Sequence, residues 1–585
     1  MAKYLLLINI GPVQGFIATA RRTRDLYAGS RLLSEAARAV AEVLERNGVE
    51  LIFPSTQEKS LKTLAEAGIP NVIMGTVEGK DPAMLAKEAQ NAAQDHLLKK
   101  AAEIFGKAGG LLQNEDAARK QVADLLEFYW VAIPYEGEKD YAKARQNATR
   151  YMAARKNTRD FAPVTWGGPV QKSSLDGALE SVIDLRWKYE KLSDIPDEVK
   201  QSHEKAKLKK GIRPGEELSG VDFLKRRYLV EEQRPFASTT LMALLPFLEG
   251  LSEDERKALK EAIENLKPFI EVTSDSRIPE HLARRFPLLK DFDTRVFFPS
   301  RHRELAEDSQ AAEVGEKEPW EESRRRLTEF YKRLGREPYP YYAILLADGD
   351  HMGRVIDQQK RVDDHRAISR QLAGFAGRVR RIVEKHDGSL VYSGGDDVLA
   401  LLPLHTALAC ARELAEEFRR QLAGFCTEDG QSPTLSVGIA LVHHLFDLGE
   451  AFELARRAEK KAKESRNALA VLWSPRSGVE TVVQGPWCEG PRPLDRRLSD
   501  FADWLQEDTI PARFAYELKE ASRILAGNGE LLKREAERIL KRKEVRDQGL
   551  IQDLQELIEA IGPERLASEL IVARPFARAK ALLKG

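Results

Sequence analysis

The sequence predicts an α+β fold with two ferredoxin-like domains and two mainly helical domains. Between residues 341 and 473, apolar runs and helical repeats alternate in the order β-α-β-β-α-β, followed by a further helix and strand. A second group of strand-like runs lies near the N-terminus, at 3–10, 50–53 and 71–74. The residues from 492 onward show heptad-like apolar spacing with alternating charges, which is typical of a helical bundle.

The hydrophobic pattern of the later ferredoxin-like domain predicts each of its elements. Residues 341–347 are a buried-strand run, and 363–385 carry apolar residues at helical spacing, namely Ile368, Leu372, Phe375, Val379 and Ile382. A hairpin follows at 390–402. The remaining predicted elements are a helix at 404–425, a strand at 434–442, a helix at 448–465 and a strand at 468–473.

The hairpin carries four residues that indicate a function, Gly394-Gly395-Asp396-Asp397, between its two apolar runs. The glycine pair permits a tight turn with positive φ and lets a nucleotide approach the backbone without meeting a Cβ atom. Two adjacent carboxylates offer the hard oxygen ligands that Mg²⁺ prefers. The alternative interpretation is a hairpin whose turn is merely hydrophilic.

A third carboxylate follows the strand at 341–347, where the sequence is Asp348-Gly349-Asp350. In a ferredoxin-like sheet this strand lies beside the hairpin, so Asp348 should meet the hairpin carboxylates. We therefore predict a site for Mg²⁺ or Mn²⁺ whose members are Asp348, Gly349, Asp396 and Asp397, with the three aspartates as catalytic residues. Three carboxylates around one or two metal ions suit nucleotidyl transfer, because the ions neutralise charge on the phosphoryl group and the leaving pyrophosphate.

Basic residues on the last helix of this domain are candidate nucleotide contacts. Lys460 and Lys463 are three residues apart, so they share a helix face and can reach a triphosphate. With Ser393, Gly394 and Gly395 they complete the nucleotide-binding residues predicted here. The alternative for each lysine is a solvated helix face.

Composition excludes several classes of protein. The 585 residues include 92 Lys+Arg and 92 Asp+Glu, so any RNA contact must come from local basic patches. Because the chain shows no signal peptide and no apolar run long enough for a membrane span, we expect a cytoplasmic protein without membrane contact. The 3 cysteines are scattered, which excludes a disulfide framework.

Several motifs resemble known families. The DxD strand end, the GGDD hairpin and the segment beginning Ser436-Val-Gly-Ile-Ala resemble the palm of GGDEF-type nucleotide cyclases. GGDD followed by Val398, and the strand end Asp-Gly-Asp-His-Met-Gly, are more similar to the large palm-domain subunit of type III CRISPR effector complexes. Residues 8–34 independently resemble the first palm of the Cmr-type (III-B) branch, and further matches lie at 154–161, 172–177 and 234–240. The resemblance covers nearly the whole chain.

This resemblance implies a signalling and scaffold subunit of an RNA-guided complex. It implies metal-dependent conversion of ATP to cyclic oligoadenylates, activated by target RNA. The implied partners are ATP, guide RNA, target RNA and the other Cmr-type subunits. Two alternatives stay open: a catalytically idle scaffold that anchors the guide-RNA end of the complex, and a diguanylate-type cyclase that uses GTP.

By the same resemblance, residues 1–105 form the first palm and 336–478 the second. Because the first palm lacks DxD and GGDD, we expect it to be degenerate, without a metal site of its own. The resemblance implies that Gly11, Gln14 and Ser30 contact a second nucleotide held between the palms. The alternative is that Gly11-Pro12 only begins a helix.

Residues 106–335 are assigned to a mainly helical inter-palm domain and 479–585 to a C-terminal helical bundle. Polar segments at 192–210 and 304–322 are expected to be surface loops. Many relatives bind zinc through four cysteines in the inter-palm domain, but serines stand at the corresponding positions and the chain has no CxxC pair. Since serine hydroxyls do not replace thiolates around Zn²⁺, we expect no structural zinc and stabilisation by packing instead.

Larger relatives begin with an HD-type nuclease domain, whereas this chain opens directly with a palm strand. No HD nuclease is therefore expected in this chain. The one His-Asp dipeptide, His386-Asp387, precedes Gly388 and is interpreted as a plain turn between a helix and the hairpin.

Overall fold

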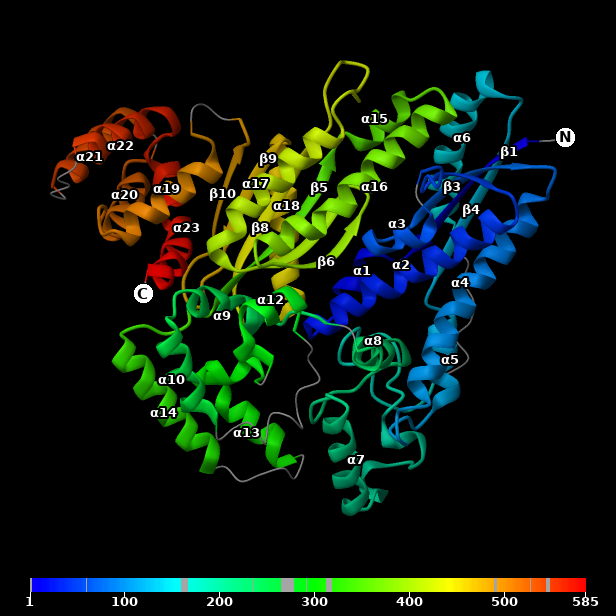
Figure 1. Ribbon diagram of the computed structural model, residues 1–585, viewed down its shortest axis with the longest axis horizontal. Coiled ribbons are helices and arrows are strands. Elements are labelled where there is room, and N and C mark those ends of the chain that lie inside the picture. The colour runs from blue at the N-terminus through cyan, green and yellow to red at the C-terminus, as the bar shows by residue number, and fades with distance from the viewer. Residues whose placement is uncertain are drawn as a thin grey trace.

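The computed structural model describes residues 3–58, 60–158, 167–233, 235–264, 278–290, 292–311, 318–488, 492–526, 528–542 and 548–584. Two β-sheets with covering helices lie side by side, the helices between residues 197 and 334 lie below both sheets in this view, and the C-terminal helices flank the second sheet (Figure 1). None of the helices in these ranges combines the length and the hydropathy that a membrane span needs.

The first sheet has four strands in the order β2-β3-β1-β4, and each neighbouring pair is antiparallel. The strands are β1 (Lys3–Gly11), β2 (Glu50–Phe53), β3 (Val72–Glu78) and β4 (Glu127–Pro134). The helices between them are α1 (Gln14–Ala18), α2 (Thr23–Arg46), α3 (Leu61–Ala67), α4 (Pro82–Phe105) and α5 (Glu115–Ala123). This is the predicted ferredoxin-like order. Its fourth strand comes from beyond residue 105, because without β4 the central strand β1 would be an open edge.

The second sheet has six strands in the order β10-β9-β8-β5-β7-β6. The strands are β5 (Tyr341–Asp350), β6 (Ser389–Gly394), β7 (Asp397–Leu402), β8 (Thr434–His443), β9 (Ala468–Trp473) and β10 (Thr481–Pro486). The helices are α15 (Met352–Gln358), α16 (Val362–Lys385), α17 (Leu404–Gln421) and α18 (Leu448–Ser465). Strands β8, β5, β7 and β6 form the predicted ferredoxin-like unit. The appended strand β9 runs parallel to β8, and β10 pairs with β9 beyond residue 478, so the palm sheet continues past the predicted boundary.

Burial of apolar side chains explains why this pattern folds as it does. The five residues predicted as the apolar stripe of α16 are all buried. Residues 342–345 of β5 are buried without alternation, which is expected of a central strand whose two faces are both covered. The apolar spacing in the sequence therefore marks the side chains that the fold buries.

The two palms contact each other through α2 and the hairpin. The hydroxyl of Tyr27 on α2 lies 2.6 Å from the Ser389 Oγ at the start of β6. Arg366 of α16 pairs with Glu50 of β2 at 3.0 Å. These contacts hold the hairpin of the second palm against the first palm.

The inter-palm domain is mainly helical, as predicted. Its helices are α6 (Glu138–Asn157), α7 (Asp197–Lys209), α8 (Gly220–Glu231), α9 (Thr239–Glu249), α10 (Glu253–Ile263), α12 (Glu280–Arg285), α13 (His302–Ala311) and α14 (Glu318–Leu334). Its short 3-10 turns lie at Leu185–Trp187, Leu192–Asp194, Pro287–Lys290, Thr294–Phe297 and Pro299–Arg301. One more 3-10 turn, Leu582–Lys584, lies in the C-terminal region.

The expectation of surface loops at 192–210 and 304–322 was wrong for the residues that the structure describes. The first segment contains α7, and the second falls within α13 and α14. Lys207 of α7 is 0% exposed, and its ammonium lies 3.0 Å from Glu204 and 3.3 Å from Glu217. Paired charges therefore replace the apolar stripe by which a helix is recognised in a sequence.

The serines at the expected zinc positions meet around one buried carboxylate. Ser173 and Ser219 donate hydrogen bonds to Asp222 at 2.6 and 2.8 Å, and Asp222 is 1% exposed. The Ser174 N–H donates to the Glu217 carbonyl at 2.7 Å, which joins the same two segments. Hydrogen bonds thus hold these segments together, where we had expected packing alone. The absence of structural zinc stays a prediction.

The C-terminal region is the predicted helical bundle. Its helices are α19 (Leu494–Gln506), α20 (Arg513–Ile524), α21 (Gly529–Arg542), α22 (Gln548–Ile561) and α23 (Pro563–Ala581). Arg497 of α19 and Glu569 of α23 form a buried ion pair at 2.8 Å. The fold is therefore the predicted α+β class, with two ferredoxin-like palms and two mainly helical regions.

A buried arginine joins the first palm to the inter-palm domain. Arg226 of α8 is 0% exposed and pairs with Asp25 of α2 and with Glu216, both at 2.8 Å. Burial raises the pKa of both carboxyls, but Arg226 outweighs this effect. The pKa of Asp25 is lowered, and that of Glu216 falls to about 2.

Replacing this arginine should destabilise the fold strongly. Arg226→Ala is expected to cost about 3–5 kcal/mol, because it leaves two carboxylates buried without their partner. Urea unfolding of the purified chain measures the change. The control Arg534→Ala removes an exposed ion pair with Glu530 and should cost less than about 1 kcal/mol. Equal losses in the two variants would contradict this role of Arg226.

The same ion pairs predict sensitivity to acid. The folded-state pKa of Glu216 is about 2, below the ordinary value of 4.5. Its contribution to stability is therefore complete above about pH 5 and is lost as the pH falls through these two values. Glu216→Gln should lower stability near neutral pH and flatten its decline in acid, as measured by unfolding midpoints across that pH range. If the unfolding midpoint of Glu216→Gln falls with decreasing pH as steeply as that of the wild type, Glu216 is not a main cause of the sensitivity to acid.

Candidate active site

Three aspartates meet where β5 ends beside the turn between β6 and β7. One carboxylate oxygen from each of Asp348, Asp396 and Asp397 lies within 4.8 Å of the other two. Asp348 belongs to β5, Asp397 begins β7, and Asp396 lies in the turn. The structure thus brings together the three aspartates that the sequence singled out.

Strand pairing determines this meeting. Strands β5 and β7 are antiparallel with Ala347 opposite Val398, so the next positions along the two strands are Asp348 and Asp397. Two residues join β6 to β7, and the first of them, Gly395, has a φ of +72°. Two-residue hairpin turns favour glycine at such a position.

Two glycines leave room for the turn. A Cβ atom at Gly349 would lie 2.8 Å from both the Cβ and a carboxylate oxygen of Asp396, so the Asp396 side chain packs directly on the backbone of β5. A Cβ atom at Gly394 would lie 1.9 Å from the hydroxyl oxygen of Tyr392. Both positions therefore exclude a side chain.

The clustered carboxylates repel one another in a partly buried place. Burial and then the charge of Asp348 raise the pKa of Asp396 to about 7. Burial, then the charge of Asp396 and the contact with Asp348, raise the pKa of Asp397 to about 9. Carboxyl groups are shifted in this way when too little positive charge lies beside them. A divalent cation would supply that charge, and oxygen donors this close together suit Mg²⁺ or Mn²⁺.

Lys463 of α18 places one positive charge in the cluster. Its ammonium pairs with Asp348, lies 3.2 Å from an oxygen of Asp350 and donates a hydrogen bond to the Gly349 carbonyl at 2.7 Å. Burial lowers the pKa of Lys463, but these acidic partners outweigh burial and leave that pKa raised. Lys463 therefore lies among the predicted metal-site residues, whereas Lys460 is exposed one turn earlier on the helix.

Sequence reasoning gave no role to Asp350, the second aspartate of the DxD motif. Asp350 is 1% exposed, and its carboxylate accepts three hydrogen bonds at 2.8–2.9 Å, from Thr434 Oγ1, Ser436 Oγ and the Asn467 N–H. It fastens the end of β5 to β8 and to the segment after α18. The motif itself was the signal that could have indicated this residue.

Glu459 is a further carboxyl near the cluster that sequence reasoning missed. It is half-buried on α18, and its pKa is raised by burial and then by the charge of Asp348. A lone glutamate on a charged helix carries no sequence signal, so only the folded chain shows its proximity to Asp348.

A cavity of about 400 Å³ lies beside the GGDD turn, between the two palms. The second palm contributes Gly394, Gly395, Asp396 and Asp397, the first palm contributes Asn9, Asn71 and Met74, and the inter-palm helix α6 contributes Met152, among others. Many of the lining side chains are apolar, and the carboxylates of the turn lie among them. A volume of this order is typical of small-molecule sites.

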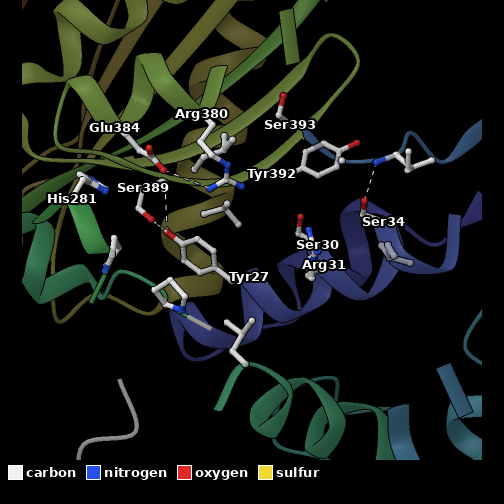
Figure 2. A pocket seen from close by; sticks show the side chains of 18 of the residues that line it. Tyr27, Ser30, Arg31, Ser34, His281, Arg380, Glu384, Ser389, Tyr392 and Ser393 are labelled. Carbon is white, nitrogen blue, oxygen red and sulfur yellow. Dashed lines mark hydrogen bonds and ion pairs between the residues drawn. The ribbon is translucent and has the colours of Figure 1, made fainter. Parts of the chain in front are cut away.

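A second cavity, of about 560 Å³, lies between α2 and β6. Figure 2 shows Ser30 of α2 on one side of it and Ser393 of β6 on the other. Gly68 and Asn71 line both cavities, so the two are neighbours at the palm interface. The predicted nucleotide contacts Ser30 and Ser393 thus share the second cavity, while the glycine pair lines the first.

Two other predicted nucleotide contacts line neither of these cavities. Gly11 ends β1 opposite Glu127, and Gln14 is exposed at the start of α1. The helix does begin just after Gly11-Pro12, which fits the alternative interpretation of that dipeptide.

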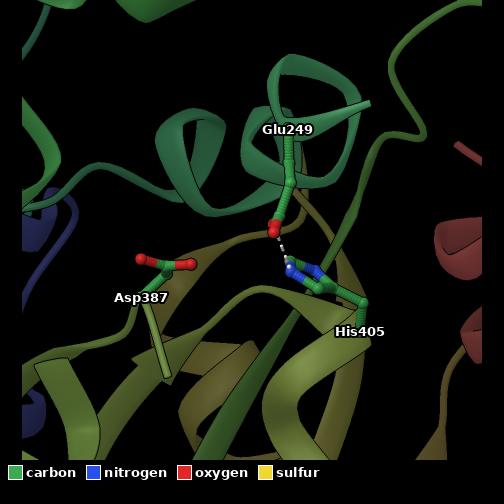
Figure 3. Close-up of side chains that lie close together, drawn as sticks. All are labelled: Glu249, Asp387 and His405. Carbon is green, nitrogen blue, oxygen red and sulfur yellow. Dashed lines mark hydrogen bonds and ion pairs between the residues drawn. The ribbon is translucent and has the colours of Figure 1, made fainter. Parts of the chain in front are cut away.

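Another group of possible metal ligands lies at the opposite end of β6. Figure 3 shows Glu249 of α9 beside His405 of α17, with Asp387 facing them. His405 Nε2 lies 2.9 Å from Glu249, and Arg285 pairs with both carboxylates. A guanidinium therefore already balances this group. The predicted turn at His386-Asp387 is present, and its aspartate ties the inter-palm helices to the second palm.

Two family models match parts of the chain. The second palm domain of Cas10/Cmr2 matches residues 341–470, which contain the aspartate cluster. The N-terminal region of the CRISPR-associated protein Cmr2 matches residues 5–106.

A curated relative and two solved structures extend these matches. The CRISPR system Cmr subunit Cmr2 of Pyrococcus furiosus is 26% identical over 562 residues, covering 83% of this chain and 63% of that protein. The chain therefore spans less than two thirds of the length of this relative. Chains in cryo-EM structures of type III-B Cmr-beta, in the apo state and bound to cognate target RNA, have the same fold. The apo chain has a TM-score of 0.61 at 15% identity, and the RNA-bound chain has a TM-score of 0.63 at 14% identity. Both matches cover 94% of this chain, and they cover 78% of the apo chain and 79% of the RNA-bound chain.

The matched segments carry both palms, and the motifs at the strand end and the hairpin lie within them. The chain is therefore similar to the large palm-domain subunits Cas10/Cmr2, in their Cmr-type (III-B) branch, over segments of both palms.

Proposed function

We propose that this chain is a nucleotidyltransferase that converts ATP to cyclic oligoadenylates. The observation that carries the proposal is the meeting of three carboxylates beside a cavity between two palms. Asp348, Asp396 and Asp397 would hold Mg²⁺ or Mn²⁺, with Gly349 beside them. When bound, such ions would lower the pKa of an attacking 3′-hydroxyl and neutralise charge on the phosphoryl group and pyrophosphate.

The other residues of the site bind and orient the nucleotides. The glycine pair opens the backbone to one nucleotide in the cavity beside the turn, whose apolar walls suit a base. Ser30 and Ser393 would contact a second nucleotide in the neighbouring cavity. Lys463 supplies a cation beside the carboxylates, where a triphosphate would lie. Gly11, Gln14 and Lys460 lie outside this arrangement.

We further infer that the chain acts as the signalling and scaffold subunit of a type III-B CRISPR complex. Its partners would be guide RNA, target RNA and the other Cmr-type subunits, and target RNA would activate the cyclase. The match to the Cas10/Cmr2 palm, the similarity to the Cmr2 subunit and the likeness to chains of Cmr-beta support this inference.

Removing the carboxylates of the turn should abolish activity. Asp396→Asn and Asp397→Asn are expected to lower cyclic oligoadenylate synthesis about 100-fold or more, the scale of losing one preorganised electrostatic contact in a transition state. The measurement is product formation from labelled ATP or GTP with Mg²⁺ or Mn²⁺, by the chain alone and in its reconstituted complex with target RNA. Asp95→Asn, an exposed carboxylate on α4, is the matched control.

The outcomes separate three functions. Adenylate products that disappear in the two variants, but not in the control, support the proposal. Products from GTP alone would favour a diguanylate-type cyclase. No product from either nucleotide, while the RNA-bound complex still assembles, would favour an idle scaffold.

Filling the space over β5 should displace Asp396 without removing any carboxylate. A Cβ atom at Gly349 would come within 2.8 Å of Asp396, so Gly349→Ala is expected to lower synthesis by about 10- to 100-fold. Gly353→Ala is the matched control, since a Cβ there meets nothing within 4 Å. Equal activity of the two variants would show that the position of Asp396 on β5 is unimportant for the reaction.

A further inference from the structure

A third cavity, of about 400 Å³, lies where the first palm, the inter-palm domain and the second palm meet. It is remote from the carboxylates. His444 lines it and directly follows β8, whose residue Ser436 is paired with Asp348. Eight residues of strand separate Ser436 from His444, which is roughly 26 Å. A ligand in this cavity would therefore be distinct from a nucleotide at the GGDD turn.

Arginines dominate the lining of this cavity. Its basic residues are Arg21, Arg22, Arg24, Arg213, Arg295 and Arg301, and its acidic residues are Glu216, Asp293 and Asp447. The arginines come from the start of α2, from the loop before α8 and from two 3-10 turns of the inter-palm domain. The first palm and the inter-palm domain thus bring guanidinium groups to one place, although the net charge of the whole chain is zero.

The carboxylates of the lining are already engaged. Glu216 pairs with the buried Arg226 and Asp293 pairs with Arg295. Asp447 caps α18 by accepting hydrogen bonds from the N–H groups of its first turn. Glu304, just outside the lining, is shared by three of the arginines, namely Arg213, Arg295 and Arg301. Among the described residues, the carboxylates around the cavity are therefore already partnered.

Arg22 lies among these positive charges, and Glu216 is a carboxylate that attracts it. Within the described part of the chain, no carboxylate forms an ion pair with its side chain. Its pKa is lowered well below the ordinary value, first by burial and then by the neighbouring Arg24 and Arg226. Because a guanidinium in a protein keeps its charge, this position calls for an anion.

Other donors surround the arginines. The first turns of α2 and α9 contribute Thr23, Thr239 and Thr240 to the lining, so the positive ends of two helix dipoles lie at the cavity. His444 is 4% exposed, and neither of its ring nitrogens has a hydrogen-bond partner. A neutral imidazole carries one N–H, so this wall contains a buried donor without an acceptor.

We propose that this cavity binds the phosphate groups of a polyphosphate, carried either by a free nucleotide or by the end of an RNA strand. Guanidinium forks match phosphate oxygens in pairs, and helix N-termini add N–H groups directed at an anion. The lining contains more charged than aromatic residues, so the site is suited to phosphate groups more than to a base. Since the walls come from both palms, a bound polyphosphate would hold the palms in one relative position at a distance from the catalytic carboxylates.

The test uses the purified chain in EDTA, so that metal-dependent binding at the GGDD turn is suppressed. Isothermal titration calorimetry would follow three probes: inorganic tripolyphosphate, a short RNA with a 5′-triphosphate and the same RNA with a 5′-hydroxyl. Arg22→Gln is expected to weaken binding of the preferred probe about tenfold or more, the effect of losing one charge-assisted contact. Arg119→Gln, on the exposed face of α5 beside Glu115, is the matched control and should bind as the wild type does.

The probes distinguish the two sources of phosphate. Tight binding of tripolyphosphate itself assigns the site to free nucleotides, whereas binding that requires the triphosphorylated RNA assigns it to a strand end. Either result supports the proposal if it depends on Arg22. The proposal would be overturned if no probe binds, or if Arg22→Gln binds the probes as tightly as Arg119→Gln does. It would also be overturned if the two RNAs bind equally and tripolyphosphate does not bind.

Thermal unfolding tests whether Arg22→Gln binds less only because the variant is less stable. Because the neighbouring arginines repel Arg22, Arg22→Gln should unfold at the same temperature as the wild type or higher in the absence of ligand. A variant that binds poorly because it is less stable would count against a binding role and against the proposal.

Discussion

The register of β5 between β7 and β8 is the constraint on which the candidate site depends. Ala347 lies opposite Val398 on one side and Val437 on the other, and all three are buried. A slip of one residue would exchange the two buried faces of the strand and disrupt the packing on both, so burial specifies the register strongly. Asp348 follows Ala347 and is carried to the hairpin turn by that register. Packing of the sheet therefore offsets the repulsion among the carboxylates.

The two aspartates of the DxD motif differ because of what surrounds each of them. Asp350 is buried and its oxygens accept several hydrogen bonds from the protein, so it is satisfied as a structural group. The side chain of Asp348 is 38% exposed and shares Lys463 with Asp350. Asp396 and Asp397 have raised pKa values, which reflect burial with too little compensating charge. One motif thus supplies both an anchor for β5 and an oxygen ligand that a cation can use.

Like charges are segregated at two ends of the second palm. Carboxylates collect beside the GGDD turn, while arginines collect where β8 ends and α18 begins. Neither concentration is visible in the composition, because Lys+Arg and Asp+Glu are equal in number. The first palm contributes no part of the aspartate cluster, yet it lines both cavities of the palm interface and supplies Arg22 and Arg24 to the arginine-lined cavity. The buried pair of Arg226 and Asp25 holds that palm in place against the inter-palm domain.

The sequence by itself determined the elements of the second palm and its three clustered aspartates, because apolar periodicity and glycine turns are local signals. The stripe of α16 and the Gly394-Gly395 turn are examples, and the structure agrees with both. Other features depend on contacts between residues that are distant in the sequence, and only the folded chain shows them. The helix α7 has no clear apolar stripe in the sequence, and its buried residue Lys207 forms ion pairs with Glu204 and Glu217. Likewise β4 and β10 join their sheets across the predicted domain boundaries, since an edge strand is chosen by pairing and not by its own sequence. Ser30 and Ser393 line a different cavity from the carboxylates, and arginines gather from two domains, because of how the domains pack, which no local pattern encodes.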